Sequence, residues 1–139
     1  MGEEDKKEFL VKEWIRKAER DLDTAHLTLD NKPAYTDIIC YHCQQAVEKY
    51  LKAYLVRLDT PFEKKHDLDY LIDLIAENNK EIEQFYDMVE TLSGYAVEIR
   101  YPDDRTEPSI EEAKAAYEIA LSIKEYVVKM MKKEGRKVD

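Results

Sequence analysis

Apolar side chains recur at helical spacing along the chain, and their pattern is broadest between residues 38 and 58. At 100° of rotation per residue, they cover nearly half of a helix circumference in this stretch. A surface helix needs a narrower apolar face, so this stretch is predicted to form the central helix of a bundle. The apolar positions are Ile39, Cys43, Ala46, Val47, Tyr50, Leu51, Ala53, Tyr54 and Leu58. The other side carries a polar stripe, which consists of Tyr41, Gln45, Glu48 and Lys52.

Four further helices are predicted from the same periodicity and from the residues that interrupt it. Their expected ranges are residues 4–30, 66–79, 80–100 and a last helix from residue 109, with the central helix running from about 34–37 to 59–61. Ser109 and Glu112 have the spacing of a capping box, and Asp67 is placed to cap the third helix. The segments 1–8 and 132–139 are expected to fray. We therefore predict one all-α domain over residues 1–139, an up-and-down bundle of about five helices.

Composition supports a helical intracellular protein and limits its partners. Only three Gly and four Pro occur among 139 residues, and 38% of the residues are charged, which favours helix over sheet. The net charge of −9 repels phosphate, so nucleic-acid binding would require a local basic patch. No signal peptide or membrane span is apparent, and we expect a soluble cytoplasmic protein without a cofactor. The abundance of Lys and Glu also suits a thermophile.

The two cysteines and a nearby histidine resemble a metal cluster only when they are written in a line. On a helix, His42 points about 160° away from Cys40 and about 100° away from Cys43, so the three side chains cannot converge on one ion. We expect no metal site here. Both thiols are instead expected to be reduced and packed in the core.

Acidic and basic residues near the helix ends leave several interpretations open. Asp21 lies at the margin of the first apolar stripe, either as a partly buried carboxylate with a basic partner or as a boundary residue that reaches water. Arg100 projects to the edge of its apolar arc, where it could pair with a carboxylate such as Asp21 or take an active role. Asp103 could hold a cation or pair with Arg105, or it could be a solvated loop acid.

His66 stands just before the predicted third helix, next to Lys64 and Lys65. A neutral imidazole there could exchange a proton, and the nearby amides could receive an anion. The alternative is that His66 and Asp67 only cap the helix. Taken alone, the polar stripe of the central helix would be a solvated face or an interface with a second copy of the chain.

Several segments, in this order, resemble the HEPN domain family. They are Trp14 with A-E-R-D-L-D-T-A at residues 18–25, C-Q-Q-A-V-E-K-Y-L-K-A at 43–53, K-H-D-L at 65–68, and R-Y-P-D at 100–103. Together they extend from residue 14 to residue 103 of the 139 residues. The resemblance implies a helical bundle that commonly dimerises and is often encoded beside a minimal nucleotidyltransferase in a two-component system of the toxin–antitoxin type. Nucleotide binding has been proposed for this branch of the family.

Other branches of the family are metal-independent RNase toxins, which carry an Arg followed by four to six residues and a His. This chain departs from that pattern, because His26, His42 and His66 all precede Arg100. Arg20 and His26 have the spacing, but on the first helix their side chains would point about 120° apart. RNA cleavage needs an imidazole beside the reacting phosphate, and only His66 could supply it to Arg100. The departure favours a role without catalysis.

The leading hypothesis is therefore a nucleotide- or phosphate-binding HEPN module that dimerises and works with a nucleotidyltransferase. Phosphate would be bound by Arg100, Lys52 and Lys65. Tyr101 would stack on a base, and His66 with Gln45 would form hydrogen bonds to the nucleotide. The alternatives are a divergent RNase that uses Arg100 and His66, and a non-catalytic assembly protein. The candidate binding residues are Arg100, Tyr101, Asp103, His66, Asp67, Lys65, Lys52, Gln45 and Tyr41.

Overall fold

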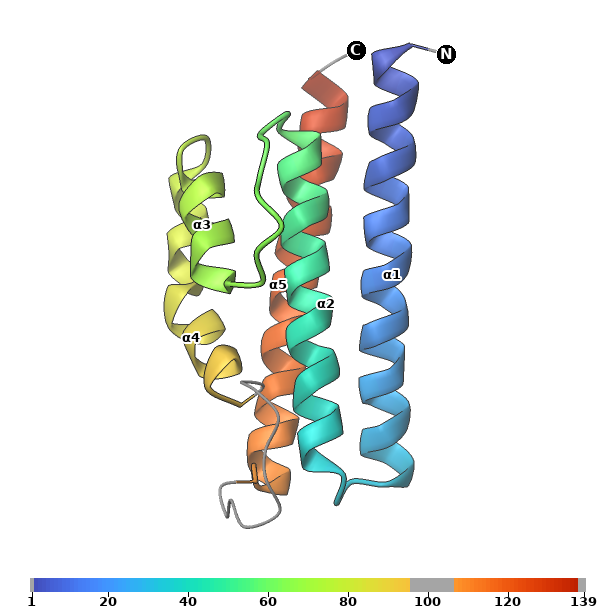
Figure 1. The fold of residues 1–139 in the computed structure, drawn as a ribbon, viewed down its shortest axis with the longest axis vertical. Coiled ribbons are helices and arrows are strands. Elements are labelled where there is room, and N and C mark those ends of the chain that lie inside the picture. Colours follow the sequence, from blue (N-terminus) through green and yellow to red (C-terminus); the bar gives the residue numbers. More distant parts are fainter. Residues whose placement is uncertain (1, 96–106, 138–139) are drawn as a thin grey trace.

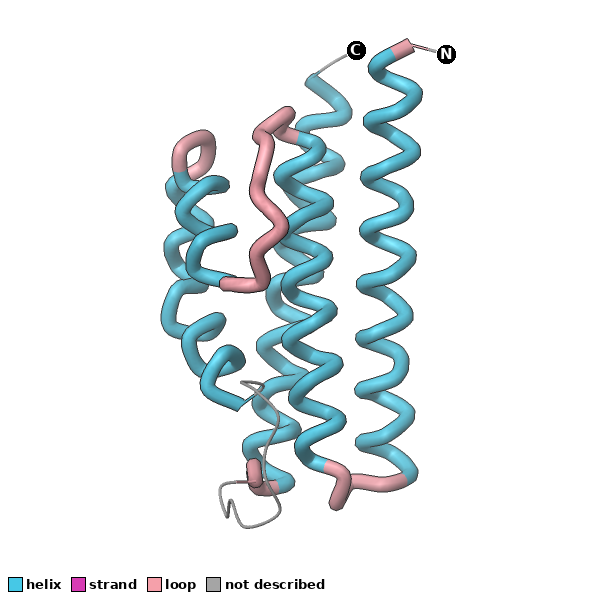
Figure 2. The backbone as a smooth tube through the Cα atoms, in the orientation of Figure 1, coloured by secondary structure: helices cyan, strands magenta, loops and turns pink. Residues whose placement is uncertain are grey.

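The computed structural model describes residues 2–95 and 107–137, which form five α-helices and one short 3-10 helix. The elements are α1 (Glu3–Asn31), α2 (Thr36–Arg57), α3 (Leu68–Ala76), η1 (Lys80–Phe85), α4 (Tyr86–Tyr95) and α5 (Ile110–Lys137). No strand occurs within these ranges, as Figure 2 shows. The predicted all-α bundle of about five helices is confirmed.

Three long helices stand side by side, with α2 between α1 and α5, and the shorter α3 and α4 form a second layer beside α2 and α5 (Figure 1). A connector, residues 58–67, returns along α2 before α3 begins. The connector therefore makes α2 and α3 run in the same direction, whereas α1 and α2 are antiparallel. As a result, α2 is covered by other elements on most of its circumference.

The core of the bundle lies along α2. Thirteen of its 22 residues are buried, which is more than the single apolar face of a surface helix supplies. Leu51 and Tyr54 are among the largest side chains that are completely enclosed. Small residues on α5, including Ala116 and Ala120, are also fully buried and let this helix approach α2 closely. The central position predicted for residues 38–58 is confirmed.

The last helix begins with the predicted capping box. The backbone amide of Glu112 donates to Oγ of Ser109 at 3.0 Å, and the amide of Ser109 donates to Oε1 of Glu112 at 2.9 Å. Asp67 occupies the N-cap position of α3, but its side chain makes no capping hydrogen bond. Its backbone carbonyl accepts from the amide of Leu71 at 3.3 Å.

The fourth predicted helix differs at its start, because residues 80–85 form the 3-10 helix η1. Oδ1 of Asn79 accepts from the amide of Glu81 at 3.0 Å, which stabilises a tight first turn. The amide group of Asn79 donates to the hydroxyls of Tyr54 and Tyr126 at 3.0 and 2.8 Å. These bonds fix Asn79 to α2 and α5, so the turn is anchored from two sides.

The segments 1–8 and 132–139, for which fraying is expected, contain helical residues. Helix α1 already begins at Glu3, and α5 continues to Lys137. Of the fourth predicted helix, α4 is described as far as Tyr95.

Candidate functional site on the central helix

The connector places His66 against the middle of α2. Nδ1 of His66 lies 3.1 and 3.3 Å from the two carboxylate oxygens of Glu48. The side chain of Glu48 is only 4% exposed, whereas that of His66 is 79% exposed. Because a carboxylate accepts hydrogen bonds, Nδ1 donates to it and Nε2 is the ring nitrogen left for another molecule. A buried acid thus orients an imidazole that faces solvent.

Lys52 lies one helical turn beyond Glu48 and completes the cluster. Its Nζ donates to Oε2 of Glu48 at 2.8 Å, and its side chain is 6% exposed. The same ammonium group lies 5.4 Å from the centre of the Trp14 ring and 5.8 Å from that of Phe62. A buried carboxylate needs such a compensating charge, and two aromatic faces stabilise the cation.

The polar stripe of α2 is therefore divided between core and surface. Tyr41 is 48% exposed and Gln45 is partly exposed, but Glu48 and Lys52 are buried. Lys52 takes a different place from the one expected, since its ammonium group neutralises Glu48 beneath Trp14 and Phe62. Helical spacing alone put these groups on one polar face. The connector and α1 then enclosed half of it.

Asp21 on α1 forms a second polar cluster with α2. Its carboxylate oxygens contact Nδ1 of His42, at 2.8 Å, and Nζ of Lys49. The side chain of Asp21 is 13% exposed, so the interpretation as a partly buried carboxylate with basic partners is correct. His42 and Lys49 were missing from the candidates. Their separation of seven residues puts them on the same side of α2, which is the signal that could have identified them.

The charged residues of the connector are exposed. Lys65 pairs with Glu63 at 3.2 Å, and its Nζ lies 4.9 Å from the centre of the Tyr70 ring. The hydrogen bond to Glu63 raises the pKa of Lys65 above its usual value. Lys64 and Asp67 are exposed as well. Arg100, Tyr101 and Asp103, with their neighbour Arg105, lie outside the described residues, so the predictions for them remain predictions.

Cys40, His42 and Cys43 point in different directions. Both thiols are fully buried, while His42 turns to Asp21. Burial raises the pKa of Cys43 to about 12, so its thiol is protonated. Within residues 2–95 and 107–137, no group of three or more His, Cys, Asp or Glu side chains could hold a metal ion. Over the same residues, none of the helices is both long and apolar enough to cross a membrane.

Comparison with known proteins places this arrangement in a family. The sequence model of the HEPN domain matches residues 11–133. The chain belongs to the HEPN family. A crystal structure of an archaeal HEPN homologue has a TM-score of 0.65 and 21% sequence identity, covering 87% of this chain and 97% of that chain. This likeness shows a shared fold. No curated protein matches the sequence.

Within this HEPN domain, the two polar clusters occupy different seams. The Asp21 cluster joins α1 to α2, whereas the cluster of Glu48, Lys52 and His66 joins α2 to the connector. Both lie inside the matched range. Only the second one presents a largely exposed titratable ring to solvent. With Nδ1 held, that ring can exchange a proton at Nε2 or, when doubly protonated, donate to an anion.

Proposed function

We propose that this HEPN domain is a nucleotide- and phosphate-binding dimerisation module that acts with a nucleotidyltransferase partner in a system of the toxin–antitoxin type. The observation that carries the binding role is the exposed imidazole of His66, oriented by the buried carboxylate of Glu48. A ring held in one orientation loses little freedom when a ligand binds, and this favours affinity. The partnership rests on membership of the family and on its implied gene neighbourhood.

In the proposed complex, the ring of His66 is doubly protonated, so that Nε2 donates to a phosphate oxygen while Nδ1 donates to Glu48. Gln45 lies one turn before Glu48 on the same side of α2 and supplies an amide for a second hydrogen bond. Lys65 adds positive charge beside His66, and Arg100, Tyr101 and Asp103 would contribute from the segment that follows α4. Lys52 acts indirectly, since it neutralises Glu48. Asp67 fixes the start of α3 through its backbone.

The dimerisation role is supported by apolar side chains that remain exposed on α2. Ile38 and Tyr41 lie on its N-terminal half and are both more than two-fifths exposed, and Tyr35 precedes them. They continue the line of Gln45 toward the start of the helix. A second copy that covers this surface would remove apolar area from water. It would also bring the two His66 sites onto one assembly.

The binding proposal predicts a selective loss when His66 is replaced. Calorimetry or equilibrium dialysis with ATP, GTP and a short RNA would be performed on wild type, His66→Ala, Gln45→Ala and Arg100→Ala. His66→Ala removes a hydrogen bond to a charged group, worth about 1.5–3 kcal/mol, so affinity should fall by about 10-fold to 100-fold. Far-ultraviolet circular dichroism melts of each variant verify that the bundle is intact.

His26→Ala is the matched control, because His26 is an exposed histidine of α1 beside Tyr117 on α5. This variant should bind like wild type. Negligible binding by the wild type itself, or equal affinity of wild type and His66→Ala for every ligand, would refute the proposed site.

A second candidate function is a metal-independent RNase, and the pairing of Glu48 with His66 favours it. An imidazole held by a carboxylate is suited to take the proton from a 2′-hydroxyl or to protonate a leaving oxygen. Cleavage of a labelled RNA in the presence of a chelator should then fall about 10²-fold or more in His66→Ala and persist in His26→Ala. Cleavage that depends on added metal, or that survives His66→Ala, would exclude this role for His66.

A further inference from the structure

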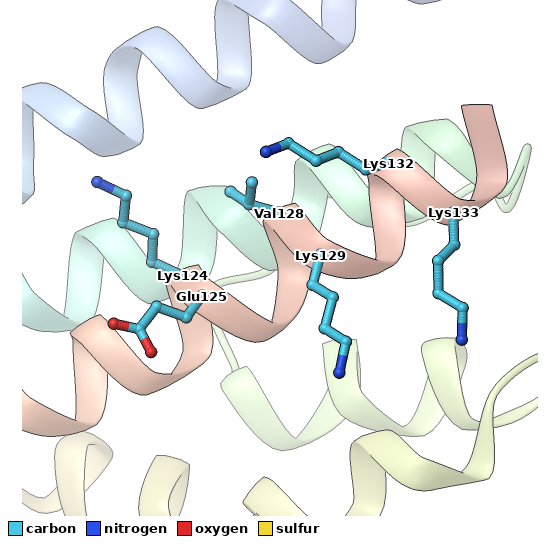
Figure 3. A pocket seen from close by; sticks show the side chains of 6 residues that line it. All are labelled: Lys124, Glu125, Val128, Lys129, Lys132 and Lys133. Atoms are coloured by element: carbon cyan, nitrogen blue, oxygen red, sulfur yellow. The ribbon is translucent and has the colours of Figure 1, made fainter. Parts of the chain in front are cut away.

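The C-terminal half of α5 carries a cluster of four lysines. We call Lys124, Lys129, Lys132 and Lys133 the lysine strip. With Glu125 and Val128 these residues line a surface pocket of about 560 Å³ (Figure 3). None of the four ammonium groups forms an ion pair with a side chain that the structure describes. Among the described residues, the strip therefore presents four ammonium groups that form no ion pair with a carboxylate.

The four side chains leave the helix in two directions. Figure 3 shows Lys124 and Lys132 projecting to one side, and Lys129 and Lys133 projecting to the other. From Lys124 to Lys133 the strip extends over nine residues, which is about 13 Å along the helix axis. The buried residues Ile123, Val127 and Met131 hold the opposite side of α5 in the bundle. The core thus fixes which face of α5 the strip occupies.

The strip is exceptional in a chain of this charge. Residues 124–139 contain six Lys and Arg against three Asp and Glu, a balance of +3, whereas residues 1–123 contain 16 against 28, a balance of −12. Positive charge is thus concentrated in the C-terminal segment of an otherwise acidic chain. This concentration supplies the local basic patch that nucleic-acid binding by a protein of net charge −9 requires.

A purely structural reason accounts for only part of the cluster. Lysines in the last turns of a helix interact favourably with its dipole, and Lys132 and Lys133 lie near the end at Lys137. This effect fades beyond the last turn, so it does not explain Lys124 or Lys129. Like charges four residues apart, such as Lys129 and Lys133, destabilise a helix. A bound polyanion would relieve this repulsion.

We propose that the lysine strip binds the phosphate backbone of a nucleic-acid strand. Val128 is the only apolar residue that lines the pocket, so a protein partner would find little of the hydrophobic and aromatic centre that interfaces require. Phosphate contacts need only spaced cations. The pocket holds no amide or aromatic side chain to read bases, so binding is independent of sequence.

This surface is separate from the His66 site. In Figure 1, α5 lies behind α2, whereas the connector that carries His66 runs along the front. Nucleic-acid binding by the strip does not require the proposed nucleotide site, and either one can fail without the other.

Fluorescence anisotropy with labelled 20-nucleotide U and dT strands at 50–200 mM KCl tests the proposal. Four phosphate contacts predict a slope of about −2.8 in log K against log salt, which is a loss of about 50-fold over this range. The double substitution Lys129→Ala/Lys133→Ala should weaken binding at low salt and halve the slope. Similar affinities for RNA and DNA are expected, because both present the same phosphates.

Lys12→Ala/Lys17→Ala is the matched control, since it removes the same charge from exposed positions of α1. This variant should keep the wild-type slope. Three results would overturn the proposal: no salt-dependent binding by wild type, equal weakening by both lysine pairs, or tighter binding of a labelled 20-residue polyglutamate than of RNA. The last result would assign the strip to an acidic protein.

Discussion

Glu48→Ala is expected to lower the free energy of unfolding by about 3–5 kcal/mol, because it leaves a buried ammonium group without its carboxylate. Lys52 is 6% exposed and is enclosed by Trp14 and Phe62, so water cannot readily replace the lost partner. Lys52→Met should be costly as well, since Glu48 would keep only His66 as a hydrogen-bonding partner. Urea denaturation at neutral pH, followed by circular dichroism at 222 nm, gives these differences.

The double variant Glu48→Leu/Lys52→Met separates the stability of the bundle from the function of the pair. Removing both charges together leaves neither unpaired, and such replacements are often neutral or stabilising. We expect its stability to return close to that of wild type. His66 would nevertheless lose the carboxylate that orients it, so affinity for nucleotide should remain low in a well-folded protein.

An exposed ion pair serves as the control for the single and double variants of Glu48 and Lys52. Glu13 and Arg16 contact each other at 2.8 Å on the surface of α1, where solvent screens the pair. Glu13→Ala should leave the unfolding curve nearly unchanged. If Glu48→Ala were equally harmless, the pair would not be structurally important. If the double variant were as unstable as either single variant, replacement of both charges would not restore the packing.

The bundle could be predicted from the sequence because helical periodicity and capping depend on residues that are close together in the chain. The apolar arc of residues 38–58 specified a helix that is surrounded by others, and α2 has this position. Ser109 and Glu112 indicated the start of α5, since the capping box involves only neighbouring residues. The 3-10 start of the fourth helix was missed. Its first turn is stabilised by the bond from the amide of Glu81 to Asn79, and Asn79 is itself anchored by bonds to Tyr54 and Tyr126, which lie 25 and 47 residues away.

The candidate site could be predicted only in part, because it also depends on contacts between segments that are far apart in the sequence. His66 was identified from its place before a helix, but its contact with Glu48 depends on the connector turning back along α2. Lys52 was assigned to a polar face, and Trp14 from α1 and Phe62 from the connector then enclosed it. Helical periodicity tells which residues share a face. Tertiary packing decides which part of that face reaches water.

Alkaline pH is expected to destabilise the bundle strongly, because two protonated groups lie in the core of α2. Burial raises the pKa of the Cys43 thiol to about 12. Burial also raises the pKa of the Tyr50 hydroxyl, and the charges of Glu19 and Asp23 add to this effect. The Tyr50 hydroxyl is fully enclosed and has no hydrogen-bond partner among the described residues.

In the unfolded chain these groups lose their protons at about pH 8.5 for Cys and about pH 10 for Tyr. The folded state retains the protons to higher pH, so it binds more protons than the unfolded state and stability falls as pH rises. The contribution of each group is fully present below its unfolded pKa and is lost as pH approaches the folded value. Each group then contributes a slope of about 1.4 kcal/mol per pH unit.

Urea denaturation under reducing conditions at pH 7–11.5 should therefore show a slope from Cys43 above about pH 8.5. The slope should steepen above about pH 10, where Tyr50 contributes together with other tyrosines whose pKa is raised, including Tyr86 and Tyr126. Tyr50→Phe should be at least as stable as wild type at pH 7, because it removes a buried hydroxyl that lacks a partner among the described residues. It should also lower the upper slope by about 1.4 kcal/mol per pH unit. Tyr41→Phe, at an exposed position of the same helix, should follow the wild-type curve. Stability that stays constant to pH 11, or a Tyr50→Phe curve parallel to that of wild type, would show that these two groups do not govern the alkaline limit of the fold.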